Sequence, residues 1–158
     1  MAAAGLALAE LAGLKGRGER HRIALAGGEA LLVDESYNAN PSSMRATLKT
    51  LAEEKVAGRR IAVLGAMREL GEGSDEFHAG LAEPIGAACV EHAILVGQEM
   101  LPLLKALGQK VNAVHVPDAA AATDALREVI RPGDAVLVKG SNSVGLSALV
   151  ESLAGGKG

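Results

Sequence analysis

Polar side chains gather in three short stretches that could do chemistry, at residues 34–41, 65–71 and 139–143. Each stretch directly follows a run of apolar residues that is typical of a buried strand. In open α/β sheets, ligands bind beyond the carboxyl ends of the strands. We therefore expect the three stretches to meet at one edge of a sheet and to form one binding site.

The first stretch could hold a nucleoside. Asp34 or Glu35 could accept hydrogen bonds from the two hydroxyls of a ribose, and Tyr37 could stack on a base. Asn38 and Asn40 add amide donors and acceptors. A structural interpretation also fits, with Asn40 as a helix N-cap and Tyr37 as a cover for the start of the helix. The density of polar groups after one buried strand favours the functional interpretation.

Cationic side chains in the other stretches point to anions. Lys139 ends an apolar strand, where a charge is costly unless it is paired or used. Ser141, Ser143 and the amides of the following helix could receive a carboxylate or phosphate, although Lys139 could instead reach solvent and Ser143 could be only a cap. Arg68 could hold a charged end of a substrate or pair on the surface. Arg17, between two glycines, could reach a phosphate or belong to a solvated basic linker.

The sequence lacks the common motifs for metals, nucleophiles and phosphates. Its four histidines do not have metal-ligand spacing, and Cys89 has apolar neighbours that predict an inert core thiol. There is no Gly-x-Gly-x-x-Gly after a strand and no Gly-x-x-x-x-Gly-Lys-[Ser/Thr]. The chain therefore lacks the usual means of gripping a nucleotide by itself.

Composition excludes several classes of partner. The 158 residues carry a net charge of −3, which gives no broad electrostatic reason to bind nucleic acid or an anionic membrane. One cysteine excludes an intramolecular disulfide and is compatible with a reducing cytoplasm. No run of residues approaches the ~18 apolar residues of a membrane span. We expect a cytoplasmic protein.

Short apolar strands alternate with helices, a pattern that specifies parallel βαβ units. Strands are expected at 61–65, 93–97, 111–116 and 135–140, and helices at 41–56, 98–107, 118–130 and 144–153. A hairpin over 22–33, turning at Gly27-Gly28, should supply an antiparallel edge strand. Ser74 should cap a helix that Pro84 kinks or ends. The predicted fold is α/β, a doubly wound Rossmann-like sheet of about six strands, mostly parallel, with helices on both faces.

Four segments resemble the C-terminal domain of the Mur ligase family of peptidoglycan synthesis. Residues Ser36–Met44 closely resemble the Ser-Tyr-Asn-Ala-Asn-Pro-x-Ser-Met signature of the members that add D-Ala-D-Ala. Gly16–Arg20 looks like the family's Gly-Arg-x-Glu stretch. Ile61–Gly71 is similar to its Leu-Gly-x-Met-x-Glu-Leu-Gly loop, and Val138–Ser141 to its Val-Lys-Gly-Ser ending. The resemblance covers about residues 14–153, with the segments in the family's order.

The resemblance implies a domain division and a reaction. Residues 14–158 would form the C-terminal domain, and residues 1–13, expected to be helical, would be a remnant of the central domain that carries the P-loop and metal site. ATP would phosphorylate the carboxylate of UDP-MurNAc-tripeptide, and the amine of D-Ala-D-Ala would attack the acyl phosphate. ATP and Mg²⁺ would serve the full-length enzyme, a monomer whose central domain is this chain's partner. The chain alone is expected to be inactive.

The resemblance also assigns roles to residues, none of them catalytic or metal-binding. ATP binding would fall to Arg17, Asp34, Glu35, Tyr37, Asn38 and Asn40, and substrate binding to Arg68, Lys139, Ser141 and Ser143. Lys139 and Ser141 would flank the carboxylate of the dipeptide. Two alternatives remain, namely another ligase of the Mur or folylpolyglutamate synthase type, and a non-catalytic α/β binding module.

Overall fold

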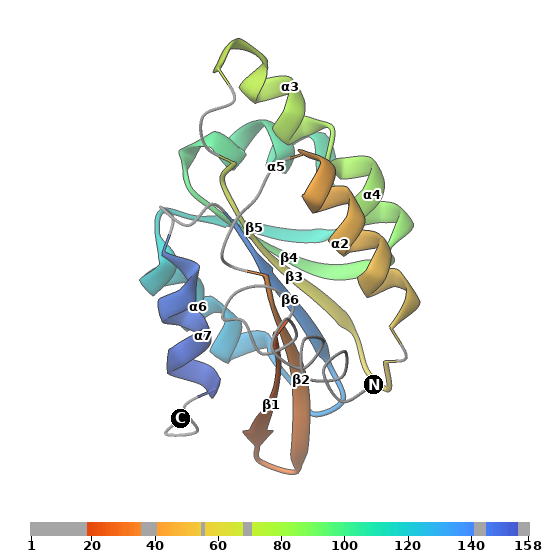
Figure 1. Ribbon diagram of the computed structural model, residues 1–158, viewed down its shortest axis with the longest axis vertical. Coiled ribbons are helices and arrows are strands. Elements are labelled where there is room, and N and C mark those ends of the chain that lie inside the picture. The colour runs from red at the N-terminus through yellow and green to blue at the C-terminus, as the bar shows by residue number, and fades with distance from the viewer. Residues whose placement is uncertain (1–18, 36–40, 55, 68–70, 141–144, 155–158) are drawn as a thin grey trace, which may run out of the picture.

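The structure, a computed structural model, describes residues 19–35, 41–54, 56–67, 71–140 and 145–154, and these form one sheet with helices on both faces (Figure 1). The strands are β1 (Glu19–Leu25), β2 (Gly28–Glu35), β3 (Arg60–Gly65), β4 (Val90–Val96), β5 (Asn112–Val116) and β6 (Ala135–Lys139). The α-helices are α2 (Pro41–Glu53), α3 (Ser74–Ala79), α4 (Ala82–Ala87), α5 (Leu101–Leu107), α6 (Ala119–Val129) and α7 (Leu146–Ala154). Two short 3-10 helices are η1 (Gly71–Gly73) and η2 (Gln98–Met100).

The strand order is β1-β2-β6-β3-β4-β5, and β1 pairs antiparallel with β2 while the other neighbours are parallel. This confirms the predicted fold. The hairpin turns one residue earlier than expected, because Leu25 pairs with Gly28 and leaves Ala26 and Gly27 as the loop. Gly27 has a φ of +92°, a conformation that glycine adopts without strain.

Two hydrophobic cores lie on the two faces of the sheet. Side chains from α2, α4 and α5 pack on one face, and side chains from α6 and α7 pack on the other. Along β3, Ala62 and Leu64 belong to the first core, and Ile61 and Val63 belong to the second. This alternation explains why the strand is an unbroken apolar run, since side chains point to both faces and both are covered. Among the described helices, none is long and apolar enough to cross a membrane.

The residues expected to begin or end helices were predicted correctly in some cases and wrongly in others. Asp118 caps α6 as expected, because its carboxylate accepts a hydrogen bond of 2.9 Å from the amide of Ala121. The prediction for Ser74 is wrong, since Gly73 occupies the N-cap and Ser74 is the first helical residue. The helix does break near Pro84, but it ends at Ala79, and Pro84 lies in the first turn of α4, where its missing N–H is not needed.

The prediction of a core thiol is also wrong. Cys89 is exposed and has a φ of 57° in the turn that leads from α4 into β4. The neighbouring side chains of Ala88 and Val90 enter the first core instead.

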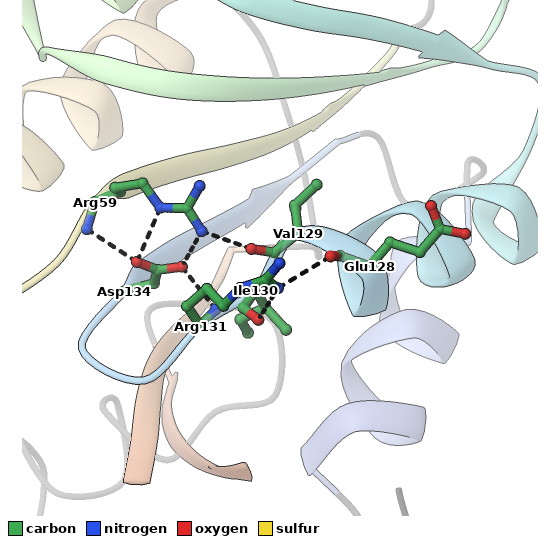
Figure 2. Close-up of polar contacts among 6 residues, drawn as sticks. All are labelled: Arg59, Glu128, Val129, Ile130, Arg131 and Asp134. Atoms are coloured by element: carbon green, nitrogen blue, oxygen red, sulfur yellow. Dashed lines mark hydrogen bonds and ion pairs between the residues drawn. The ribbon is translucent and has the colours of Figure 1, made fainter. Parts of the chain in front are cut away.

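An aspartate anchors the amino end of β6. Asp134 is 2% exposed, and its carboxylate lies between the Arg59 side chain and the backbone of Arg131 (Figure 2). It accepts hydrogen bonds from the backbone amides of Arg59 at 2.9 Å and Arg131 at 2.8 Å, and from Nη2 of Arg59 at 2.9 Å. Burial acts to raise the pKa of Asp134, but the hydrogen bonds from Arg59 and Arg131 outweigh it and hold the pKa below its ordinary value.

The same segment joins three strands. The backbone oxygen of Asp134 accepts from the amide of Leu31 in β2, and the amide of Ala135 donates to the oxygen of Arg59 next to β3, both at 2.9 Å. Asp134 therefore fixes where β6 begins between its two neighbours.

Asp134→Asn should lower the free energy of unfolding at pH 7 by about 2 kcal/mol, because charge-assisted hydrogen bonds to a buried carboxylate are lost. Since the folded pKa is lowered, this stabilisation is present above the ordinary aspartate pKa near ~3.9 and disappears as the pH falls through the folded value. Urea denaturation of both proteins across this range should show the two stabilities converging in acid.

Glu29→Gln is the matched control, because Glu29 forms an exposed ion pair with Arg22 at 3.7 Å and should contribute nothing measurable. Equal losses for the two variants, or a difference that does not change with pH, would contradict the anchoring role.

Candidate functional site

The carboxyl ends of β2, β6 and β3 lie side by side. Lys139 in β6 is in register with Glu35 in β2 on one side and with Leu64 in β3 on the other. The described parts of the three predicted stretches therefore do meet at one edge of the sheet, as expected.

This edge is also where the connections change face. α2 follows β2 and the pair α3–α4 follows β3, and side chains of α2 and α4 pack in the first core. α7 follows β6 and packs in the second core, on the opposite face of the sheet (Figure 1). In open α/β sheets in general, ligands bind in a crevice beyond the strand ends beside such a reversal, and the name used below refers to this position. We call this place, between the ends of β2, β6 and β3, the β6 crevice.

Lys139 and Glu35 form a coupled pair of charges in the β6 crevice. Both follow residues of the first core by two positions, so both side chains lie on the α2 face. Lys139 is 4% exposed, and burial lowers the pKa of its ammonium while the Glu35 carboxylate acts in the opposite direction. Glu35 is half-buried, and burial raises its pKa, against the effect of Lys139 and with that of Asp34. Burial therefore disfavours the charged forms of both Lys139 and Glu35.

Asp34 lies on the other face of the sheet. It is fully buried, and both Leu32, two residues earlier in β2, and Val138, its register partner in β6, belong to the second core with α7. The two carboxylates that the sequence placed together are therefore separated by the alternation of the strand. Of the two, Glu35 is the one that a ligand entering from solvent can reach.

Two glycines bring the floor of the β6 crevice close together. A Cβ atom on Gly140 would lie 2.9 Å from the Cα of Gly65 and 2.9 Å from Cδ1 of Leu146. Only glycine fits at this separation, and it lets the backbones of β6 and β3 approach each other closely. This contact was not predicted from the sequence, although a glycine at the end of each apolar run, Gly65 and Gly140, was the available signal.

A buried histidine completes the β3 side. His78 in α3 is fully buried, and its Nε2 accepts a hydrogen bond of 2.9 Å from the amide of Met67. The sequence analysis considered the histidines only as metal ligands. In the described part of the chain, no group of three or more His, Cys, Asp or Glu residues could hold a metal ion.

Several predicted site residues lie outside the described residues. They are Arg17, Tyr37, Asn38, Asn40, Arg68, Ser141 and Ser143. Their assignments remain predictions, while Lys139, Glu35 and Asp34 are placed as stated above.

A second hollow lies elsewhere on the molecule. It has a volume of about 810 Å³ and is lined by residues of β4, β5 and α6, including His92, Asn112 and Glu128. Its described lining contains no lysine or arginine, so it offers no cation to an anionic ligand. The β6 crevice is the better candidate because it combines a buried charge with the reversal of the connections.

Comparisons with known proteins point in one direction. The family model for the Mur ligase, glutamate ligase domain, matches residues 16–142. The chain is 37% identical over 142 residues to the UDP-N-acetylmuramoyl-tripeptide–D-alanyl-D-alanine ligase of Synechocystis sp., covering 88% of this chain and 30% of that ligase.

Solved structures agree with the sequence comparisons. The MurF ligase from Thermotoga maritima in complex with ADP matches with a TM-score of 0.71 and 27% identity, over 90% of this chain and 31% of that one. A bifunctional folylpolyglutamate synthase/dihydrofolate synthase from Yersinia pestis, complexed with AMPPNP and a manganese ion, has a TM-score of 0.60 at 22% identity, over 89% of this chain and 31% of that one. The second likeness concerns the fold alone.

Gly140→Ala should destabilise the chain by about 1–3 kcal/mol, because the new Cβ collides with the backbone of Gly65 and forces β6 and β3 apart. Gly86→Ala is the matched control, since a Cβ there would meet nothing within 4 Å and alanine favours the helix α4. Chemical denaturation measures both. If the two variants had the same stability, the close contact of β6 and β3 would be refuted.

Proposed function

Because the chain belongs to the Mur ligase glutamate ligase domain family, we propose that it is the C-terminal domain of an ATP-dependent ligase that adds D-Ala-D-Ala to UDP-MurNAc-tripeptide. Residues 14–158 form this domain in the proposal, and residues 1–13 belong to the central domain before it. The activity for which the Synechocystis relative is named supports this choice of reaction. The chain spans 30% of that relative, so the proposed activity belongs to a longer protein.

The observation that carries the proposal is the buried cation of the β6 crevice. Lys139 is nearly inaccessible, and burial already disfavours its charged form. An arriving carboxylate would add a negative charge beside Lys139, next to that of Glu35, and its hydrogen bond to an ammonium is strong where water is largely excluded. We assign this carboxylate to the C-terminus of D-Ala-D-Ala, flanked by Lys139 and Ser141, with Arg68 and Ser143 as further substrate contacts.

The role of this domain in the reaction is to position groups. ATP would activate the carboxylate of the tripeptide as an acyl phosphate. The amine of D-Ala-D-Ala would then form the amide bond as the carbon–oxygen bond to phosphate breaks, releasing phosphate and a proton. Holding the dipeptide by its carboxylate places its amine, and correct placement alone accounts for a large part of such a rate.

The nucleotide side of the site is assigned to Arg17, Asp34, Glu35, Tyr37, Asn38 and Asn40. Among these, Glu35 fits a contact with ribose because its carboxylate is half-buried at the strand end, whereas Asp34 is enclosed on the α7 face. Mg²⁺ and the phosphates would be held by the central domain, which is consistent with the absence of a P-loop motif in this sequence. We place the full enzyme in the cytoplasm as a monomer that closes this domain onto ATP.

A folylpolyglutamate-type ligase is the alternative within the same fold. Among the solved structures, the MurF ligase from Thermotoga maritima matches with higher identity and TM-score, 27% and 0.71, than the Yersinia pestis structure, 22% and 0.60, and this supports the D-Ala-D-Ala reaction. The Ser-Tyr-Asn-Ala-Asn-Pro run at residues 36–41 supports the same choice. A non-catalytic binding module would give no reason for the segments to match the family in order.

In the full-length enzyme, Lys139→Met should raise the KM for D-Ala-D-Ala about tenfold or more, because one charge-assisted hydrogen bond is lost, and should leave the KM for ATP nearly unchanged. Methionine keeps the length and suits the buried position. Steady-state kinetics with each substrate varied in turn provide the measurement.

The matched control is Lys105→Met, which removes an exposed lysine on α5 and should leave both KM values unchanged. An unaltered KM for D-Ala-D-Ala in Lys139→Met, or a rise in the KM for ATP alone, would remove Lys139 from the dipeptide site.

The chain by itself should neither hydrolyse ATP nor ligate, because the proposed catalytic and phosphate-binding groups lie in another domain. Phosphate release measured with the purified chain, ATP and Mg²⁺ should equal the rate without protein. Turnover that follows the concentration of the chain would show that the division of labour proposed here is wrong.

A further inference from the structure

We propose that His78 is a positioning residue for the β6 crevice, because its ring holds the Met67 peptide group on the β3 side of the substrate site. This inference rests on the proposed function and goes beyond it, since no role in the reaction follows from the resemblance for a residue in α3. His78 acts through Met67 and does not itself touch a substrate.

The hydrogen bonds of His78 fix its tautomer. The backbone N–H of Met67 can only donate, so Nε2 of His78, 2.9 Å away, must be unprotonated and accept. In a neutral ring the proton then sits on Nδ1, which lies 2.7 Å from the carbonyl oxygen of Ser74 and donates to it. A proton on Nε2 would place two donors against each other. The fully buried ring is therefore used at both nitrogens.

The Met67 amide needs this acceptor because the sheet ends one residue before it. The amide of Ala66 still donates to the oxygen of Val96 in β4 at 3.0 Å. Met67 is 1% exposed and its side chain packs in the first core, so its N–H is held away from water. A buried amide without an acceptor loses the hydrogen bond that it would make in water, and His78 removes this cost. The backbone and the side chain of Met67 are thus both fixed.

Met67 stands at a place where a small displacement matters. Leu64 is in register with Lys139, and Gly65 meets Gly140 at the floor of the β6 crevice. Met67 lies two residues beyond Gly65 along the same segment. A shift of the Met67 peptide group would move the β3 side of the crevice relative to Lys139. In a ligase that works by positioning, a displacement of about 1 Å can cost ~100-fold in rate.

Two substitutions separate the two nitrogens of His78. In His78→Gln, the side-chain amide reaches as far as Nε2 and its oxygen can accept from Met67. In His78→Asn, the shorter amide reaches only the position of Nδ1, so it can donate to Ser74 but leaves the Met67 amide without an acceptor. In the full-length enzyme, His78→Asn should lower kcat/KM for D-Ala-D-Ala about tenfold to 100-fold, and His78→Gln should recover most of this loss.

A variant that destabilises the same core but keeps the acceptor of the Met67 amide serves as the control. Ile85→Val in α4 shortens a fully buried side chain of the first core and should lower the melting temperature with kcat/KM unchanged. If Ile85→Val reduced kcat/KM as much as His78→Asn at a similar melting temperature, His78 would be only structural. Equal kinetics for His78→Asn and His78→Gln would also overturn the proposal.

Hydrogen exchange of the chain by itself tests whether His78 holds the Met67 amide, independently of any effect on ligation. The Met67 amide should exchange at least about tenfold faster in His78→Asn than in His78→Gln, because only glutamine offers an acceptor at that reach. Fast exchange with normal ligation by full-length His78→Asn would overturn the positioning role and leave the proposed function standing. If the wild-type enzyme did not ligate D-Ala-D-Ala, both the proposed function and the positioning role of His78 would be overturned. Assaying the wild-type enzyme first reveals this result before any variant is made.

Discussion

The contact between Asp134 and Arg59 sets the position of β6, and the site depends on that position. Asp134 ties the start of β6 to Leu31 on one side and to Arg59 on the other through backbone and side-chain hydrogen bonds. A slip of one residue along either neighbour would send Lys139 from the α2 face to the α7 face. Because β6 runs only from Ala135 to Lys139, an anchor at its amino end determines where its last side chain stands. A structural ion pair thus positions the buried cation at the other end of the same strand.

The buried charges at the two ends of β6 behave in opposite ways. At the amino end, hydrogen bonds from Arg59 outweigh the effect of burial, and the lowered pKa of Asp134 means that its charged form is stabilised by the fold. At the carboxyl end, burial lowers the pKa of Lys139 and raises that of Glu35, so the fold disfavours the charged form of each. The fold favours the charge of a group of the first kind, whereas a ligand of opposite charge can offset the cost of burial for a group of the second kind. This contrast distinguishes the structural end of the strand from the candidate site.

Features that depend on residues close together in the sequence could be predicted, and features that join distant segments could not. Alternating apolar runs predicted the strands and the two covered faces, and Asp118 was recognisable as a cap because its acceptor and donor lie three residues apart. The insertion of β6 between β2 and β3 is not contained in any local pattern, since it depends on which strands the helices can cover. The prediction that Ser74 is an N-cap was wrong because the neighbouring Gly73 occupies that position. The prediction that Cys89 is a core thiol was wrong because the residue lies in a tight turn, which outweighs the effect of its apolar neighbours. The partnership of His78 with Met67 joins separate elements, so only the structure reveals it.

The β6 crevice is built from strand ends and short contacts, and this suits the proposed division of work between domains. The sequence contains no phosphate-gripping loop, so in the proposed ligase the reactive phosphate and the dipeptide are held by different domains. The amine must then meet an acyl carbon that is carried by another rigid body, and each domain has to fix its own substrate firmly. The contact of Gly65 with Gly140 fixes the floor, His78 fixes the β3 side, and the register of β6 fixes Lys139. Rigidity at these backbone points, rather than reactivity of a side chain, is what this domain would contribute to the reaction.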